Sequence, residues 1–322
     1  MRRRSLLRWP AALLGTSAVG TIGLGGCAQF GVGHPLSADR LIDLRSGRDI
    51  GVDELLRQAR SCRYLLLGEQ HDNPHHHARR AGLLRRLNDS AAVVVAEHLT
   101  RGQHAAADGD LLAALQGAGF DPGGWQWPLH QPLFEAVREA GLPLLGGNLP
   151  PQTARRIARE GEAALTGELA DIASLLQAAP LPAEVQARLD ADLLAGHCGH
   201  LGAARLPATR LAQRARDAAM ALALHRSAGR PAVLLAGNGH VRSDHGVPHL
   251  LAVLDPAALI VNVVFGETGG ETGSDTSGGP GSAPHETRAT HLWITPSVQR
   301  EDPCLAFDRM RRPVVPERSQ AR

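Results

Sequence analysis

The amino-acid sequence predicts an α/β protein in which a parallel-type central sheet is flanked by helices and carries a helical insertion subdomain. Short runs of Leu, Val and Ile are continuous instead of alternating with polar residues, which is typical of parallel strands buried on both faces. These runs alternate with helical stretches, and such alternation favours a parallel sheet. The chain has 322 residues, of which 43% are hydrophobic, so it can bury a sizeable core.

The first 26 residues are predicted to be a signal peptide of the lipoprotein type. An arginine-rich start is followed by an uncharged run that ends in small residues before Cys27, and the Cys27 sulfur is the expected site of lipid attachment. An uncleaved membrane anchor is the alternative, although Pro10 and five glycines would make a poor helix. Arg3 and Arg4 resemble a twin-arginine signal, so export by either the Sec or the twin-arginine route is expected. We expect a lipoprotein of the cell envelope, anchored by its lipid at the periplasmic face of the outer membrane.

The remaining elements follow in chain order after a linker and lead-in at 27–59. An α/β domain is expected over 60–312. Its strands are predicted at 62–67, 91–96, 142–145, 232–236, 257–265 and 290–295. Its helices are predicted at 74–87, 131–140, 151–160, 183–194 and 208–227. The helical insertion spans about 161–206, the glycine-rich segment of about 267–287 is predicted to be a disordered loop, and 313–322 a disordered tail.

Polar side chains follow almost every predicted strand. Because ligands of open parallel sheets bind beyond the carboxyl ends of the strands, these side chains are expected to share one edge. They are Glu69, His71, Glu97, Asn148 and His240. A single His or Glu after a strand is usually a cap or a solvated loop residue. The convergence of five such residues, with glycines before His240 and before Glu69, is what indicates a site.

Two other groups of residues allow two interpretations each. His197, Cys198 and His200 either ligate a metal or form a helix end bracketed by glycines. The aromatic segment around Trp125 either belongs to the core or forms the wall of a site for a flat ligand.

Composition excludes several classes of function. All 34 basic residues are arginine, which excludes Schiff-base and pyridoxal-phosphate chemistry. A net charge of +2 gives no broad cationic field, so no nucleic-acid partner is expected. Beyond Cys27 only Cys62, Cys198 and Cys304 remain, an odd count that argues against a disulfide scaffold while permitting one disulfide.

These motifs together resemble the ChaN-like haem-binding lipoproteins of the Tiki superfamily. The segments that carry the resemblance are the run from Leu65 to His76, Glu97, the aromatic segment, the Gly196–Gly199 turn, the run from Ala212 to Asp217 and the run from Leu235 to Arg242. The resemblance covers about 60–266. It implies a ChaN-like α/β core, a role in iron or haem uptake, and haem held between two copies of the chain as a homodimer.

The resemblance also implies a set of haem-binding residues, with one departure. The family uses a tyrosine on the haem iron, whereas Tyr64 is the sole tyrosine here and falls inside a predicted buried strand. His75 or His76 is therefore expected as the axial ligand. The other expected cofactor-binding residues are His71, Asn148, Arg216, His240 and Arg242, the two arginines serving the haem propionates.

The alternative function is a metal-dependent hydrolase acting on a peptide or an ester. In that case Glu69, His71 and His240 would hold a divalent metal and Glu97 would be the catalytic general base. A structural envelope lipoprotein with a relict site is a third possibility.

Overall fold

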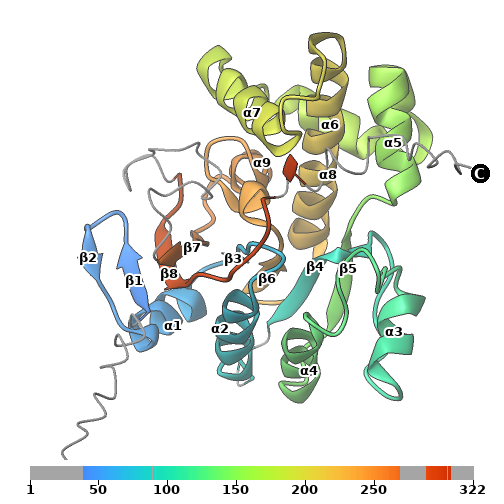
Figure 1. Ribbon diagram of the computed structural model, residues 1–322. Helices are drawn as coiled ribbons and strands as arrows, with labels where there is room; N and C mark the ends of the chain where they lie inside the picture. Colours follow the sequence, from blue (N-terminus) through green and yellow to red (C-terminus); the bar gives the residue numbers. More distant parts are fainter. Residues whose placement is uncertain (1–38, 89, 91, 269–287, 303, 306–322) are drawn as a thin grey trace, which may run out of the picture. The chain divides into compact units, whose positions relative to one another are not determined.

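The computed structural model describes residues 39–88, 90, 92–268, 288–302 and 304–305. The predicted signal peptide, the lipidation site Cys27, the tail at 313–322 and most of the predicted loop at 267–287 lie outside these residues. The described part of the chain forms an eight-stranded sheet in the order β2-β1-β8-β7-β3-β6-β4-β5 (Figure 1). Its strands are β1 (Arg40–Asp43), β2 (Arg48–Asp49), β3 (Tyr64–Leu67), β4 (Val93–Thr100), β5 (Leu144–Asn148), β6 (Ala232–Leu235), β7 (Ile260–Thr268) and β8 (His291–Pro296). The six strands from β8 to β5 run parallel, and β1 and β2 add an antiparallel edge.

Helices cover both faces of the sheet, which confirms the predicted α/β class (Figure 1). The first face packs against α1 (Val52–Ser61), α2 (Pro74–Arg85), α3 (Leu111–Gly117) and α4 (Gln131–Glu139). The second packs against α5 (Pro151–Glu160), α6 (Ala170–Ala178), α8 (Leu206–Arg226) and α9 (Val247–Leu254), and α7 (Ala183–Gly196) lies against α8. Leu65 and Leu67 enter the first core and Leu66 the second. This division explains why β3 reads as a continuous apolar run.

Two strands extend further than the sequence indicates. β4 continues through Glu97 and His98, and β5 through Asn148, so these residues lie within strands and not after them. The pairing of β4 with β5 resumes at Thr100 after an irregularity beyond Ala96. A β-carbon on Gly146 would lie 1.9 Å from the Thr100 carbonyl oxygen, so glycine permits this close approach.

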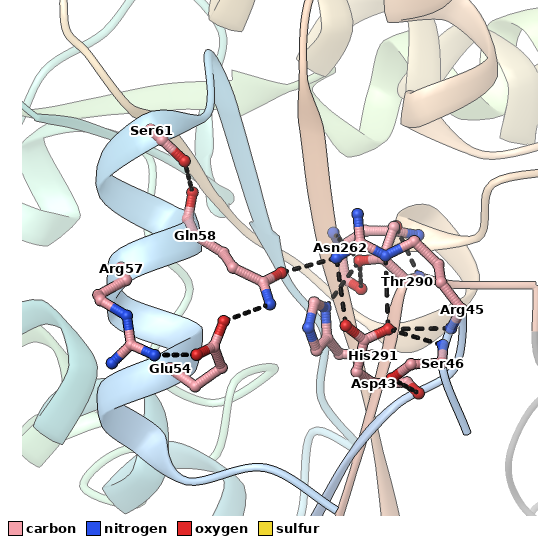
Figure 2. Close-up of polar contacts among 10 residues, drawn as sticks. All are labelled: Asp43, Arg45, Ser46, Glu54, Arg57, Gln58, Ser61, Asn262, Thr290 and His291. Atoms are coloured by element: carbon pink, nitrogen blue, oxygen red, sulfur yellow. Dashed lines mark hydrogen bonds and ion pairs between the residues drawn. The ribbon is translucent and has the colours of Figure 1, made fainter. Parts of the chain in front are cut away.

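Residues 40–61, most of which were expected to be a lead-in, contribute β1, β2 and α1. Figure 2 shows the polar contacts between the turn after β1 and helix α1. The Asp43 carboxylate accepts the backbone N–H of Arg45 at 2.9 Å, and the Arg45 guanidinium donates to Gln58 of α1 at 2.7 Å. Nearby, the Asn262 and Thr290 side chains bond each other's backbone N–H groups at 2.9 and 3.0 Å, which ties β7 to the start of β8 (Figure 2).

The predicted insertion at 161–206 is helical and contains α6, α7 and three short 3₁₀ turns (Gly161–Ala164, Gly167–Leu169 and Ala203–Arg205). Cys198, just after α7, forms a disulfide with Cys304, 106 residues further along the chain. Cys62 is a free, buried thiol. In the part of the chain that the structure describes, no helix combines the length and apolar character of a membrane span.

Candidate functional site

The candidate site lies where β3, β4 and β6 end, at the carboxyl edge of the parallel strands. Glu69 and His71 follow β3, Glu97 and His98 lie late in β4, and His240 lies in a 3₁₀ turn (Asn238–Val241) after β6. This is the edge at which open parallel sheets bind ligands. Two groups of side chains meet there, one around Glu69 and one around Glu97.

The Glu69 carboxylate is fully buried and is surrounded by imidazoles. Its Oε1 lies 2.7 Å from His71 Nδ1, 3.2 Å from His98 Nε2 and 3.5 Å from His130 Nε2. Its Oε2 forms an ion pair with Arg80, whose guanidinium is also fully buried. Burial lowers the pKa of His98 well below its ordinary value and that of His130 to about 3, so both rings are neutral.

His77 and Arg80 support this carboxylate from α2. His77 Nε2 donates to the His71 carbonyl oxygen at 3.0 Å, which leaves its Nδ1 to accept from Arg80 at 3.0 Å. Burial lowers the pKa of the Arg80 guanidinium to about 9. Because that value is still well above 7, Arg80 stays charged and balances the buried Glu69 carboxylate.

The Glu97 carboxylate has both oxygens engaged. Oε1 accepts from Arg216 at 2.6 Å and lies 3.2 Å from His240 Nε2, while Oε2 accepts the backbone N–H of Gly237 at 2.7 Å. Burial alone would raise the pKa of Glu97, but His240 and Arg216 hold it well below its ordinary value. His240 Nδ1 lies 2.5 Å from Asp217. Burial alone would lower the pKa of His240, yet its two carboxylate partners raise it to about 9.

His71 joins the two groups. Its side chain is 45% exposed, its Nδ1 faces Glu69, and its ring packs edge-on against Trp125 with centroids 5.0 Å apart. A β-carbon on Gly237 would lie 2.9 Å from His71 Nε2, so the glycine after β6 leaves room for this ring. Partial desolvation lowers the pKa of His71, which keeps the imidazole neutral.

A pocket of about 430 Å³ opens beside His71. Its lining includes Glu97, Trp125, Asn148, Arg155 and Arg216, and the His71 ring packs against Trp125. The Arg216 side chain is 27% exposed and its Nε donates to Asn148 Oδ1 at 3.1 Å. The pocket therefore combines the flat Trp125 ring with two arginines and two carboxylates, those of Glu97 and Asp121. A flat ligand that carries carboxylates can stack on the ring and pair with the guanidinium groups.

The structure brings His71, Asn148, Arg216 and His240 of the predicted cofactor residues to this edge. His76 lies in the core against Phe265, where its Nδ1 accepts the N–H of Gln70. Burial lowers the pKa of His76 to about 4. His75 is half-buried, and within the described part of the chain it bonds no residue of the pocket lining. Arg242 is ion-paired with Asp244 and Asp192, so it links the loop after β6 to α7.

The predicted metal set is divided between the two groups. Glu69 and His71 lie together, whereas His240 pairs with Glu97 and Asp217. His98 and His130 instead complete the ring of nitrogens around Glu69. Sequence reasoning did not select His130, Arg80 or His77 as site residues. His77 and Arg80 lie three apart on the face of α2 that carries the buried Leu83 and Leu84, and such polar residues on an apolar face were the available signal.

The remaining candidates have structural roles. Tyr64 lies at the other end of β3 and is fully buried, with its hydroxyl hydrogen-bonded to His225 and Asp255. Cys198 is in the disulfide, and His197 Nδ1 bonds the Leu193 carbonyl at 2.7 Å at the end of α7. The glycine-bracketed segment therefore forms a helix end.

Comparisons with known proteins agree with the resemblance seen in the sequence. A family model described as haem-binding uptake, Tiki superfamily, ChaN matches residues 55–251. The solved structure of ChaN from Campylobacter jejuni, described as binding haem cofacially, has a TM-score of 0.63 at 17% identity and covers 80% of this chain and 97% of its own. A Bacillus cereus protein of known structure has a TM-score of 0.37 at 13% identity, covering 67% and 68%. No curated protein matches the chain.

Proposed function

The chain belongs to the haem-binding uptake family of ChaN proteins in the Tiki superfamily, and from this premise we propose that it is a lipid-anchored haem-binding protein of iron or haem uptake. Membership supports haem as the ligand. The structural observation behind the proposal is that His71 lies beside the pocket at the carboxyl edge of the sheet.

His71 is the proposed ligand of the haem iron. Histidines that bind metals usually donate their second ring N–H to a carboxylate, which fixes the tautomer and turns the ring. His71 has that arrangement, since its Nδ1 lies 2.7 Å from Glu69 Oε1. The lone pair of Nε2 is then free to bind iron, and the exposed ring is accessible. Tyr64 is buried at the opposite end of its strand, so it cannot serve this role.

The pocket residues fit the other parts of haem. Haem supplies the iron, and this chain binds and orients the macrocycle. Trp125 offers a flat surface, and Arg216 and Arg155 are placed to pair with propionate carboxylates. His240 is charged and engaged by two carboxylates, so its role is to hold Glu97 and thereby Arg216 in place.

The envelope location rests on the sequence of residues 1–27. We propose a lipid on Cys27 that holds the protein at the periplasmic face of the outer membrane. The cofacial haem binding described for the Campylobacter protein supports a haem pair shared by two copies of this chain.

Titration with hemin tests the haem proposal. A saturable shift of the Soret band is expected, and His71→Ala should weaken binding at least tenfold. His75→Ala is the matched control, because His75 lies four residues further on in α2 and, among the described residues, bonds none of those that line the pocket. This variant should bind hemin as the parent does. The absence of a saturable shift would overturn the proposal. Equal affinity of the two variants would remove His71 from the ligand role.

The hydrolase has less support. A general base must accept a proton near neutral pH, and the pKa of Glu97 is held well below its ordinary value by His240 and Arg216. Both of its oxygens already accept hydrogen bonds. Glu97 therefore acts as an anchor for the pocket arginine.

A further inference from the structure

We propose that Glu69, His71, His98 and His130 form a binding site for one divalent transition-metal ion that adjoins the pocket, which His98 also lines. This site differs from the set Glu69, His71 and His240 that the sequence suggested. The proposal rests on the positions of these four side chains. It shares one residue, His71, with the proposed haem site.

The four ligand atoms converge from three parts of the fold. Glu69 and His71 come from the loop after β3, His98 from β4, and His130 from the residue before α4. One ligand atom from each residue lies within 4.8 Å of the others. In a tetrahedral site with bonds of about 2.0–2.1 Å, ligand atoms lie roughly 3.3 Å apart. The distances from Glu69 Oε1 to the three nitrogens, 2.7, 3.2 and 3.5 Å, bracket that value.

Buried nitrogens without partners are the second observation. The His130 side chain is 1% exposed, and among the described residues its Nε2, which lies 3.5 Å from Glu69 Oε1, makes no hydrogen bond. His98 Nδ1 is likewise buried without a partner. A buried polar atom that lacks a hydrogen-bond partner is unfavourable for the folded state. A metal bound through His130 Nε2, which faces Glu69, would give this nitrogen the interaction it lacks. His98 would bind through Nε2, the nitrogen that faces Glu69, and its Nδ1 would stay without a partner.

The donor set selects the class of metal. Three imidazoles with one carboxylate suit zinc, iron, nickel and copper, whereas magnesium and calcium prefer oxygen ligands. Arg80 forms an ion pair with the far oxygen of Glu69 and donates to His77 Nδ1, so Glu69 Oε1 remains directed at the three imidazoles. This support resembles the outer hydrogen bonds that fix ligands at known metal sites.

His71 cannot serve the metal and the haem iron at once. A neutral imidazole carries one proton. A metal on Nδ1 sends that proton to Nε2, which then has no lone pair for iron. Metal loading should therefore weaken hemin binding, by on the order of tenfold if His71 is the iron ligand.

Cobalt is the probe, because Co²⁺ replaces zinc at tetrahedral sites and absorbs visible light there. Protein freed of metal with a chelator is titrated with Co²⁺, and one equivalent should bind with tetrahedral absorption. His130→Gln and His98→Gln should each weaken binding at least tenfold. His291→Gln is the matched control, since His291 is equally buried but lies on β8. Far-ultraviolet circular dichroism and urea unfolding confirm that each variant is folded.

The outcomes separate this inference from the haem proposal. Co²⁺ binding that is absent, or that both glutamine variants retain in full, overturns the metal site even if hemin binds. Co²⁺ binding without any hemin binding supports the metal site and removes the haem function. If both bind and Co²⁺ leaves the hemin affinity unchanged, the assignment of His71 as a shared ligand is wrong.

Discussion

Replacing Arg80 by methionine is expected to destabilise the protein strongly as long as Glu69 is kept. Both side chains are fully buried, and the guanidinium is the cation in contact with the Glu69 carboxylate. Without it, Glu69 would be a buried and uncompensated charge. Removing one partner of a buried ion pair costs about 3–5 kcal/mol of the free energy of unfolding.

The double variant Arg80→Met/Glu69→Gln is expected to recover most of that loss. Arg80 Nε and Nη1 have no hydrogen-bond partner among the described residues, so the pair is already poorly satisfied. Replacing a whole buried pair with uncharged groups of similar volume is often neutral or stabilising. The coupling energy between the two sites should therefore be about 3 kcal/mol or more.

Urea unfolding of the parent, the two single variants and the double variant measures this coupling. Chelator is added so that a bound metal does not compensate Glu69. A loss below about 1 kcal/mol for Arg80→Met, or a double variant as unstable as the sum of the single ones, would refute the reasoning. Either result would mean that the carboxylate is protonated or hydrated in the native protein.

Three further measurements follow from the structure. Gly237→Ala places a β-carbon 2.9 Å from His71 Nε2, so it should weaken hemin binding at least tenfold, while Gly239→Ala, with no atom within 4 Å of its β-carbon, should not. Burial alone would raise the pKa of Asp244, but Arg242, His245 and Arg188 outweigh burial and lower the pKa to about 2. The ionised Asp244 carboxylate should therefore add about 2 kcal/mol to the free energy of unfolding, measured as the difference between the parent and Asp244→Asn. This difference should be complete above pH 4 and disappear as the pH falls through 2. A difference that persists at pH 2 would contradict the prediction. Cys304→Ser should lower the free energy of unfolding by about 2–4 kcal/mol, measured under non-reducing conditions, and a reductant should bring the parent to the same value.

The sequence predicts the central strands well because their side chains are buried on both faces. Tyr64–Leu67 and Ala232–Leu235 differ from their predicted ranges by at most two residues at an end, and Pro151–Glu160 has the predicted bounds. The end of β4 could not be found in this way, since Glu97 and His98 interrupt the apolar run. They are tolerated inside a strand because each has a partner from another element, Arg216 of α8 or Glu69.

The candidate site is predictable as an edge but not as a set of contacts. Position after a strand places Glu69, His71 and His240 together on one edge. It does not say that His240 turns to Glu97 and Asp217, or that His130 arrives from the start of α4. These pairings depend on the need to balance charges inside the protein, where a buried carboxylate is stable only beside a cation. His76 shows the reverse, because a histidine beside a site motif can be a core residue against Phe265.

The disulfide between Cys198 and Cys304 also bears on the order in which the protein matures. Thiols stay reduced in the cytosol and are oxidised in the periplasm and at cell surfaces. A chain that folds before crossing the membrane, as a twin-arginine route requires, would cross it with this pair still reduced. The helical insertion and the segment after β8 would then be joined only on arrival. The oxidation state of Cys198 and Cys304 in the isolated protein thus indicates the compartment in which the chain resided. An oxidised pair would support the envelope location that we propose.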